Sequence, residues 1–348
     1  MTAPPGELRP APSPPDPARR PRPGRALRVL RYLLAVVFTA LSAVLVLPDL
    51  LGLDGRGPFA QVVAFRPWLL LVGLALVVSL GLVLWWVRPA RATVAPFAAG
   101  ALAVLLVGAA LVLPRAIPDP QPSAGRHLTV LAFNAFEGSA DPVQLAALIA
   151  EQQPDLVSIS EVGERYLGAF RPMVEQLGYR AETSSTASAN VASVTLLVSQ
   201  RLGDVSLRIG TETSVFPYLE ATGGELGPLR FVAYHAAAPL RFWMPRWRAD
   251  LALLAQWCAG TTPAIVAGDF NATLDHSALR AGMAGCADAA DQRGAGLMPT
   301  WSPTERTQVF GPQIDHVIAT AGIAAETFTV HDIDGSDHRA VVTRLRIP

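Results

Sequence analysis

Long stretches without charged residues constrain this chain more than any other feature of its sequence. Trp68–Val87 and Ala92–Leu113 carry no charge, and a third apolar stretch, Tyr32–Leu53, is interrupted only by Pro48 and Asp49. Each approaches or exceeds the roughly 20 residues that cross a hydrocarbon core. Buried helices of soluble proteins are rarely so long and so uniformly apolar. We therefore predict three transmembrane helices, at about 32–53, 68–87 and 92–113, within a region that covers residues 28–113.

The segments around these stretches indicate their orientation. Residues 1–27 are rich in Pro, Ala and Arg, and we expect a disordered tail because they cannot bury enough apolar surface to offset ordering. Basic residues favour the cytoplasmic side of a membrane, so this tail and the loop that contains Arg88 and Arg91 are expected there. Residues 114–125 then form a Pro-rich linker, and everything after it lies outside the cytoplasm. The two further apolar stretches argue against a cleaved signal peptide.

Charge is unevenly distributed although the formal net charge is zero. Residues 126–348 contain 16 Arg against 23 Asp plus Glu, residues 1–125 contain 12 Arg against 5 acids, and the chain has no Lys. An acidic segment lacks the basic stripe that grips duplex DNA, which disfavours a duplex nuclease. The two cysteines, Cys258 and Cys286, form no CxxC motif, so a structural zinc site is unsupported. The sequence leaves open whether they form a disulfide or remain free thiols.

Residues 126–348 mix short buried strands with helices. Runs of four to eight apolar or β-branched residues are typical of buried strands. The expected strands are 127–133, 156–160, 194–198, 215–221, 229–234, 264–267, 314–319 and 340–346, and the expected helices are 142–151 and 248–258. The order lacks the regular alternation of a doubly wound sheet. We therefore predict an α/β sandwich of two packed sheets covered by helices.

The segment Pro263–Thr273 (PAIVAGDFNAT) carries the most chemical information. A buried strand leads to Gly268, and Asp269 and Asn271 follow at a spacing that places both side chains on one side of an extended chain. A carboxylate and a carboxamide together can orient a water molecule and hold a phosphoryl oxygen. An isolated motif of this kind would more often be an Asx-rich turn after a strand.

Further apolar strands also end in polar residues suited to metal or phosphate chemistry. Taken singly, each is an ordinary capping, surface or structural residue, but together and in this order they indicate one site. They are Asn134, Glu161 in PDLVSISEV, His235 in FVAYHAAAP, Asp315 in IDHVI, and Asp337 with His338 in GSDHRAV.

This ordered set resembles the endonuclease/exonuclease/phosphatase family, the DNase I-like metal-dependent phosphoesterases, over roughly residues 126–348. The resemblance implies a four-layer α/β sandwich and dependence on Mg²⁺ or Mn²⁺. It also implies metal ligation by Glu161, supported by Asn134, with Asp337 as a second carboxylate. Asp269 then corresponds to the residue that orients the attacking water, with Asn271 beside it. His338, held by Asp315, and His235 correspond to the phosphate-facing histidines.

Mg²⁺ prefers oxygen ligands and keeps several of its water molecules. One or two carboxylates and a substrate phosphate are therefore enough to complete its coordination shell. We therefore expect a membrane-anchored hydrolase that cleaves a phosphodiester or phosphomonoester outside the cytoplasm. Its substrate is a nucleic acid, a phospholipid head group or a small phosphorylated molecule, and its other partner is the lipid bilayer. The alternative is a catalytically retired, membrane-anchored interaction module on the same fold. A transporter is disfavoured because Asp49, near one edge, is the only ionisable residue in the three stretches.

Overall fold

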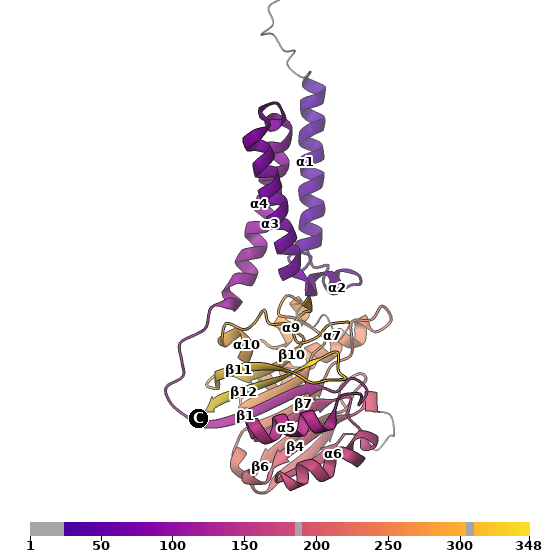
Figure 1. Cartoon of the computed structure of the whole chain (residues 1–348), viewed down its shortest axis with the longest axis vertical. Coiled ribbons are helices and arrows are strands. Elements are labelled where there is room, and N and C mark those ends of the chain that lie inside the picture. The colour runs from indigo at the N-terminus through magenta and orange to yellow at the C-terminus, as the bar shows by residue number, and fades with distance from the viewer. Residues whose placement is uncertain (1–23, 185–189, 304–309) are drawn as a thin grey trace, which may run out of the picture.

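The computed structural model describes residues 24–184, 190–303 and 310–348, so most of the expected N-terminal tail lies outside the described residues. Three apolar helices stand on one side of an α/β domain (Figure 1), namely α1 (Arg25–Val46), α3 (Arg66–Trp86) and α4 (Arg91–Val112). All three are long and apolar enough to cross a membrane. Below, they are called the apolar helices.

The first apolar helix begins and ends seven residues earlier than the expected span 32–53. It ends at Val46, directly before Leu47 and Pro48, because the residue before a proline is disfavoured in helical conformation. Asp49 consequently lies below the helix and is not part of it. Its carboxylate pairs with Arg66, the first residue of α3. The short helix α2 (Phe59–Ala64) lies between α1 and α3.

The α/β domain contains two mixed six-stranded sheets. The first has the order β11-β12-β1-β2-β4-β3, and the second has the order β5-β6-β7-β8-β10-β9. In each sheet the central pair is parallel, β1 with β2 and β7 with β8, and the other neighbours are antiparallel. The strands are β1 (Arg126–Asn134), β2 (Leu156–Ser160), β3 (Tyr179–Thr183), β4 (Val194–Ser199), β5 (Val205–Gly210), β6 (Tyr218–Gly223), β7 (Arg230–His235), β8 (Ala264–Asp269), β9 (Cys286–Asp288), β10 (Asp315–Thr320), β11 (Ala324–Asp332) and β12 (Arg339–Ile347).

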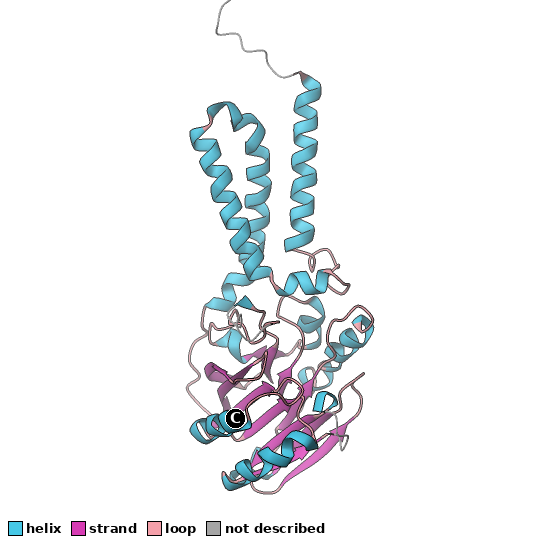
Figure 2. Cartoon of the chain, turned by 45° about the vertical axis from the view of Figure 1, so that its right-hand side comes forward, coloured by secondary structure: helices cyan, strands magenta, loops and turns pink. Residues whose placement is uncertain are grey.

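Helices cover the outer faces of both sheets (Figure 2), which gives the four layers expected from the sequence. Side chains from both sheets, such as Val130 and Phe231, form one central core. The helices of the domain are α5 (Pro142–Gln152), α6 (Glu164–Gln176), α7 (Met244–Leu253), α8 (Ala255–Cys258), α9 (Ser277–Gly282) and α10 (Ala289–Gln292). Short 3-10 turns are η1 (Arg88–Ala90), η2 (Leu113–Ala116), η3 (Asn190–Ala192), η4 (Gln200–Leu202) and η5 (Gly224–Leu226).

Two local features differ from or add to the sequence expectations. The helix expected at 248–258 begins at Met244 and is interrupted at Leu254, so that it forms α7 and α8. Cys258 and Cys286 form a disulfide bond, which joins the end of α8 to the edge strand β9.

The apolar helices contact the α/β domain directly through a buried ion-pair network. The Arg66 side chain is fully buried and bonds to Asp49, to Oδ1 of Asp275 at 2.8 Å and to the Val46 carbonyl at 2.9 Å. Arg115 also reaches Asp275, and Arg280 reaches Asp49, both at 2.9 Å. We call these five charged residues the junction network. It holds the segment that follows the GDFN motif against the base of the apolar helices.

Two hydrogen bonds beside this network hold the same segment. The Ser277 amide donates to Asp54 at 2.6 Å, and Nε2 of His276 lies 2.8 Å from the Ala60 carbonyl. Residues 272–277 are therefore attached to the chain between α1 and α3 at several points.

Candidate active site

Strand ends from both sheets converge at one edge of the sandwich. In the second sheet β8 lies between β7 and β10, which places His235 and Asp315 on either side of Asp269 in register. Gly268 lies in the close approach between β7 and β8 with a φ of 148°, where a Cβ would overlap the Tyr234 carbonyl oxygen. A glycine is therefore required directly before Asp269.

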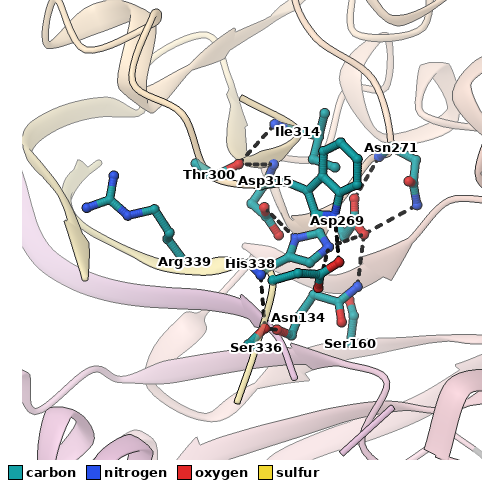
Figure 3. Close-up of polar contacts among 12 residues, drawn as sticks. Asn134, Ser160, Asp269, Asn271, Thr300, Ile314, Asp315, Ser336, His338 and Arg339 are labelled. Carbon is teal, nitrogen blue, oxygen red and sulfur yellow. Dashed lines mark hydrogen bonds and ion pairs between the residues drawn. The ribbon is translucent and has the colours of Figure 1, made fainter. Parts of the chain in front are cut away.

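Asp269 accepts hydrogen bonds from three groups (Figure 3). The Asn271 amide N–H lies 2.8 Å from Oδ1, and the Asn271 side-chain nitrogen lies 3.3 Å from Oδ2. Nδ2 of Asn134, at the end of β1, donates to Oδ2 at 3.0 Å. Asn271 has a positive φ of 48°, which asparagine tolerates better than most residues. The turn therefore directs both its backbone and its side chain at Asp269.

Glu161 lies directly after β2 and faces the same group. Nδ2 of Asn134 donates to its Oε1 at 3.1 Å, and the Glu137 amide donates to its Oε2 at 2.7 Å. The Asn134 oxygen accepts from the Phe136 amide at 2.9 Å, so the amide NH₂ and not the oxygen faces the carboxylates. In this arrangement the Asn134 side chain bridges Glu161 and Asp269.

His338 is held between two carboxylates (Figure 3). Its Nδ1 lies 2.9 Å from Oδ2 of Asp315, and its Nε2 lies 3.8 Å from Oδ2 of Asp269. Burial lowers the pKa of His338, but the charges of Asp315 and Asp269 outweigh burial and raise it to about 10. Asp337 lies beside it, with Oδ1 3.9 Å from Nε2 of His338 and Oδ2 bonded to Nε1 of Trp301. At neutral pH His338 is therefore a cation among carboxylates.

His235 occupies the opposite side of Asp269. Its Nε2 lies 3.6 Å from Oδ2 of Asp269 and 3.9 Å from Oε1 of Glu161. The Phe216 ring stacks on the imidazole with centroids 4.1 Å apart. Burial, together with the positive charge of His338, lowers the pKa of His235 to about 3. His235 is therefore neutral under ordinary conditions.

The side chains of the protein offset only part of the negative charge on the carboxylates of this cluster. Burial raises the pKa of Glu161 and of Asp337, and burial also raises that of Asp269 to about 7. Across the described residues, His235 and His338 are the only basic side chains within 4.0 Å of these carboxylates or of Asp315, and of the two only His338 carries a positive charge at neutral pH. Oδ1 of Asp337 and Oδ1 of Asp315 are buried without a hydrogen-bond partner. Such a site fits a divalent cation, which would satisfy free carboxylate oxygens and offset their charge.

One subset of side chains is close enough to bind a metal by itself. Single ligand atoms of Asp269, Asp315 and His338 lie within 4.8 Å of one another. However, Nδ1 of His338 is already bonded to Asp315. Of the two ring nitrogens of His338, only Nε2 is therefore free to face an ion.

All eight candidate residues from the sequence lie in this one cluster, linked by the contacts above. His316, which the strand alternation places on the opposite face of β10, contacts Asp288 at 2.8 Å and the Ala272 carbonyl at 2.9 Å. These contacts hold His316 away from the cluster. The Thr300 hydroxyl accepts from the amides of Ile314 and Asp315, both at 3.0 Å.

Two supporting residues were not predicted from the sequence. Phe216 covers His235, and the Ser336 hydroxyl accepts from the His338 amide at 3.0 Å and donates to the Asn134 carbonyl at 2.8 Å. A phenylalanine before a strand and a serine in a turn carry no distinguishing signal in one sequence.

Comparison with known proteins places this site in a family. The model of the endonuclease/exonuclease/phosphatase family matches residues 131–338. The chain belongs to this family. Family membership supports a phosphoester-hydrolase fold, and many members use divalent metals. A search of curated proteins finds no match.

Solved structures agree with the family fold. A humanized D. rerio TDP2 carrying 14 mutations aligns with a TM-score of 0.52 and 16% identity, covering 63% of this chain and 99% of that one. A conserved protein of unknown function from Enterococcus faecalis V583 aligns with a TM-score of 0.50 and 12% identity, covering 64% and 100%. At these identities the likeness concerns the fold alone.

Proposed function

We propose that this protein is a divalent-metal-dependent phosphoesterase that is anchored in a membrane and acts outside the cytoplasm. The observation that carries the proposal is the convergence of eight side chains from both sheets, with Asp269 at their centre. Four of them are acidic, and one cation, His338, offsets only part of their negative charge. A phosphate ester and a hard cation together complete such a site.

Asp269 is suited to orient the attacking water and accept its proton. The hydrogen bonds from Asn271 and Asn134 hold its carboxylate in place, and the pKa of about 7 allows proton uptake near neutral pH, with burial as the main cause. The water oxygen forms a bond to phosphorus while the bond from phosphorus to the leaving oxygen breaks. Asn271 can also donate to a phosphoryl oxygen beside the water.

The two histidines provide complementary functions. Cationic His338 offsets negative charge on the phosphoryl oxygens, and Asp315 fixes its ring so that Nε2 faces the reacting group. Neutral His235 can donate a hydrogen bond to the phosphate from the other side. Glu161 and Asp337 are the residues we propose to hold Mg²⁺ or Mn²⁺, with Asn134 positioning Glu161. The bound ion would polarise the phosphoryl oxygens and offset charge on the leaving group.

Two observations support the proposed placement outside the cytoplasm. The arginines favour a cytoplasmic N-terminus and α3–α4 turn, which puts the α/β domain on the other side when three helices cross the membrane. The Cys258–Cys286 disulfide is typical of proteins in oxidising compartments. A periplasmic-type reporter fused after Pro120 should therefore be active, and a reporter that is active only in the cytoplasm would refute this placement.

The catalytic proposal is tested with the full-length protein in detergent. Hydrolysis of bis-p-nitrophenyl phosphate, plasmid DNA and sphingomyelin would be measured with Mg²⁺, with Mn²⁺ and with EDTA. We expect turnover of at least one substrate with a metal and none with EDTA. The acidic α/β domain favours a substrate other than duplex DNA. A folded protein without metal-dependent turnover of any phosphate ester would support the alternative of a retired interaction module.

A further inference from the structure

A cleft between α2 and α7 is lined by three arginines and by no acidic residue. Arg56 comes from the segment between α1 and α2, Arg241 precedes α7, and Arg248 lies within α7. The cleft has a volume of about 700 Å³. Pockets that bind small molecules usually measure about 300–1,000 Å³. None of the eight candidate active-site residues lines it.

These arginines lack the partners that most other arginines of the protein have. Over the described part of residues 126–348, only four arginines form neither a side-chain hydrogen bond nor an ion pair, and three of these fall between positions 241 and 248. The four are Arg165, Arg241, Arg246 and Arg248. Arg56 likewise has no such contact with any described residue. The guanidinium groups of Arg241 and Arg246 lie over the rings of Phe242 and Trp243, each 5.9 Å from the ring centroid, so their positive charge is not paired with a described carboxylate.

The carboxylates nearest to Arg56 and Arg248 in the sequence, Asp54 and Asp250, form hydrogen bonds outside the cleft. Asp54 is buried and accepts from the Ser277 amide, and Asp250 is buried and accepts from the amides of Ser214 and Ala237. Neither lines the cleft. Guanidinium groups that line one cleft without carboxylates suit a phosphate group, because each planar guanidinium can donate two parallel hydrogen bonds to phosphate oxygens.

The two helices that line the cleft, α2 and α7, lie near the base of the apolar helices (Figure 1). One wall belongs to the segment between α1 and α3, and the side chain of Gln61 donates to the Pro239 carbonyl, which joins that wall to the other. Leu240 and Phe242 flank Arg241, and the two residues are 56% and 87% exposed. Exposed apolar side chains beside arginines are suited to the interface between lipid head groups and acyl chains.

We propose that Arg56, Arg241 and Arg248 bind the phosphate of an anionic membrane lipid, with Leu240 and Phe242 contacting its acyl region. This proposal rests on the membrane anchoring proposed above but not on catalysis. The apolar helices would bring lipid head groups to the level of the cleft, so the ligand is present wherever the protein is inserted.

The test uses the full-length protein in a nonionic detergent with EDTA present. Binding of dihexanoyl phosphatidylglycerol, dihexanoyl phosphatidylcholine and inorganic phosphate would be measured by microscale thermophoresis. We expect saturable binding of phosphatidylglycerol, at least tenfold weaker binding of phosphatidylcholine, and binding of phosphatidylglycerol weakened at least tenfold by Arg241→Gln or Arg248→Gln. Both side chains are exposed, so the variants should fold. The control is Arg165→Gln, an equally unpartnered arginine outside the cleft, which should leave binding unchanged.

The outcomes separate this proposal from the catalytic one. Inorganic phosphate that binds as tightly as phosphatidylglycerol would overturn the lipid assignment in favour of a free-phosphate site. Unsaturable binding, or binding that both variants retain, would overturn the site itself. Loss of phosphoester turnover in the same preparation would leave the binding result standing, because the assay measures no catalysis.

Discussion

The junction network predicts that the active-site loop depends on a residue at the foot of an apolar helix. Arg66→Met removes two ion pairs and the hydrogen bond to the Val46 carbonyl, while it keeps most of the apolar volume. Breaking a buried ion pair costs about 3–5 kcal/mol. In this variant Asp49 still pairs with Arg280, and Asp275 still pairs with Arg115, so neither carboxylate is left without a partner. We therefore expect a loss of stability at the lower end of this range, about 3 kcal/mol. The loss falls on residues 272–277, which follow Asn271 directly.

Hydrogen–deuterium exchange of the full-length protein in detergent measures this loss locally. Because about 1.4 kcal/mol corresponds to a tenfold change, amides of residues 272–277 should exchange about 100-fold faster in Arg66→Met. The Ser277 amide, bonded to Asp54, is among them. The control is Arg88→Met, the same change in the exposed turn that follows the far end of α3. Exchange within about threefold of the parent, or a rise spread evenly over the α/β domain, would refute this reasoning.

Three further predictions concern the cluster around Asp269. Burial lowers the pKa of His338, but the charge of Asp315 helps to raise it to about 10, and Asp315→Asn removes this charge. The alkaline limb of the plot of kcat against pH should therefore move to lower pH. An unmoved limb would show that protonated His338 is not required for catalysis. Burial raises the pKa of Glu161, so its carboxylate takes up a proton more readily as the pH falls. Titration calorimetry should therefore find weaker Mg²⁺ binding at pH 5.5 than at pH 7.5. Equal affinities at the two pH values, or parental affinity in Glu161→Gln, would show that Glu161 does not bind the metal. Gly268→Ala should lower the free energy of unfolding by about 3 kcal/mol, because its Cβ would overlap the Tyr234 carbonyl oxygen. Gly168→Ala, where a Cβ meets open space, is the control and should leave stability unchanged. A thermal unfolding midpoint of Gly268→Ala equal to that of the parent would contradict the close approach to Tyr234.

The eight strands expected from the sequence are the eight interior strands of the two sheets. The four that were not predicted, β3, β5, β9 and β11, are the four edge strands. An edge strand is partly exposed, as the pattern of β5 illustrates, so it lacks the continuous apolar run that marks a buried strand. Four interior strands, β1, β2, β7 and β8, end at the site, whereas β10 and β12 begin there, so Asp315 and the Asp337–His338 pair lie at or just before the start of their strands and not after them as the sequence suggested. The order of these polar residues at strand ends was informative because both kinds of end lie at one edge of the sandwich.

Contacts between distant segments were beyond the reach of sequence reasoning. Arg66 and Asp275 are 209 positions apart, and both stand in ordinary sequence surroundings. The orientation of the Asn134 side-chain amide depends on a hydrogen bond from the Phe136 backbone amide, and no sequence motif indicates this bond. The disulfide likewise required the positions of α8 and β9, because spacing alone does not show whether two cysteines are close enough to pair.

The role of Asp269 is the central claim, and one comparison of rates tests it most directly. The full-length protein and Asp269→Asn would be assayed on bis-p-nitrophenyl phosphate with saturating Mg²⁺, with Asp204→Asn, a change at an exposed position, as the control. Loss of a general base typically lowers kcat by about 10²–10⁴-fold, and we expect a fall in this range with the control unaffected. Mg²⁺-dependent turnover by Asp269→Asn at the parental kcat would contradict the account.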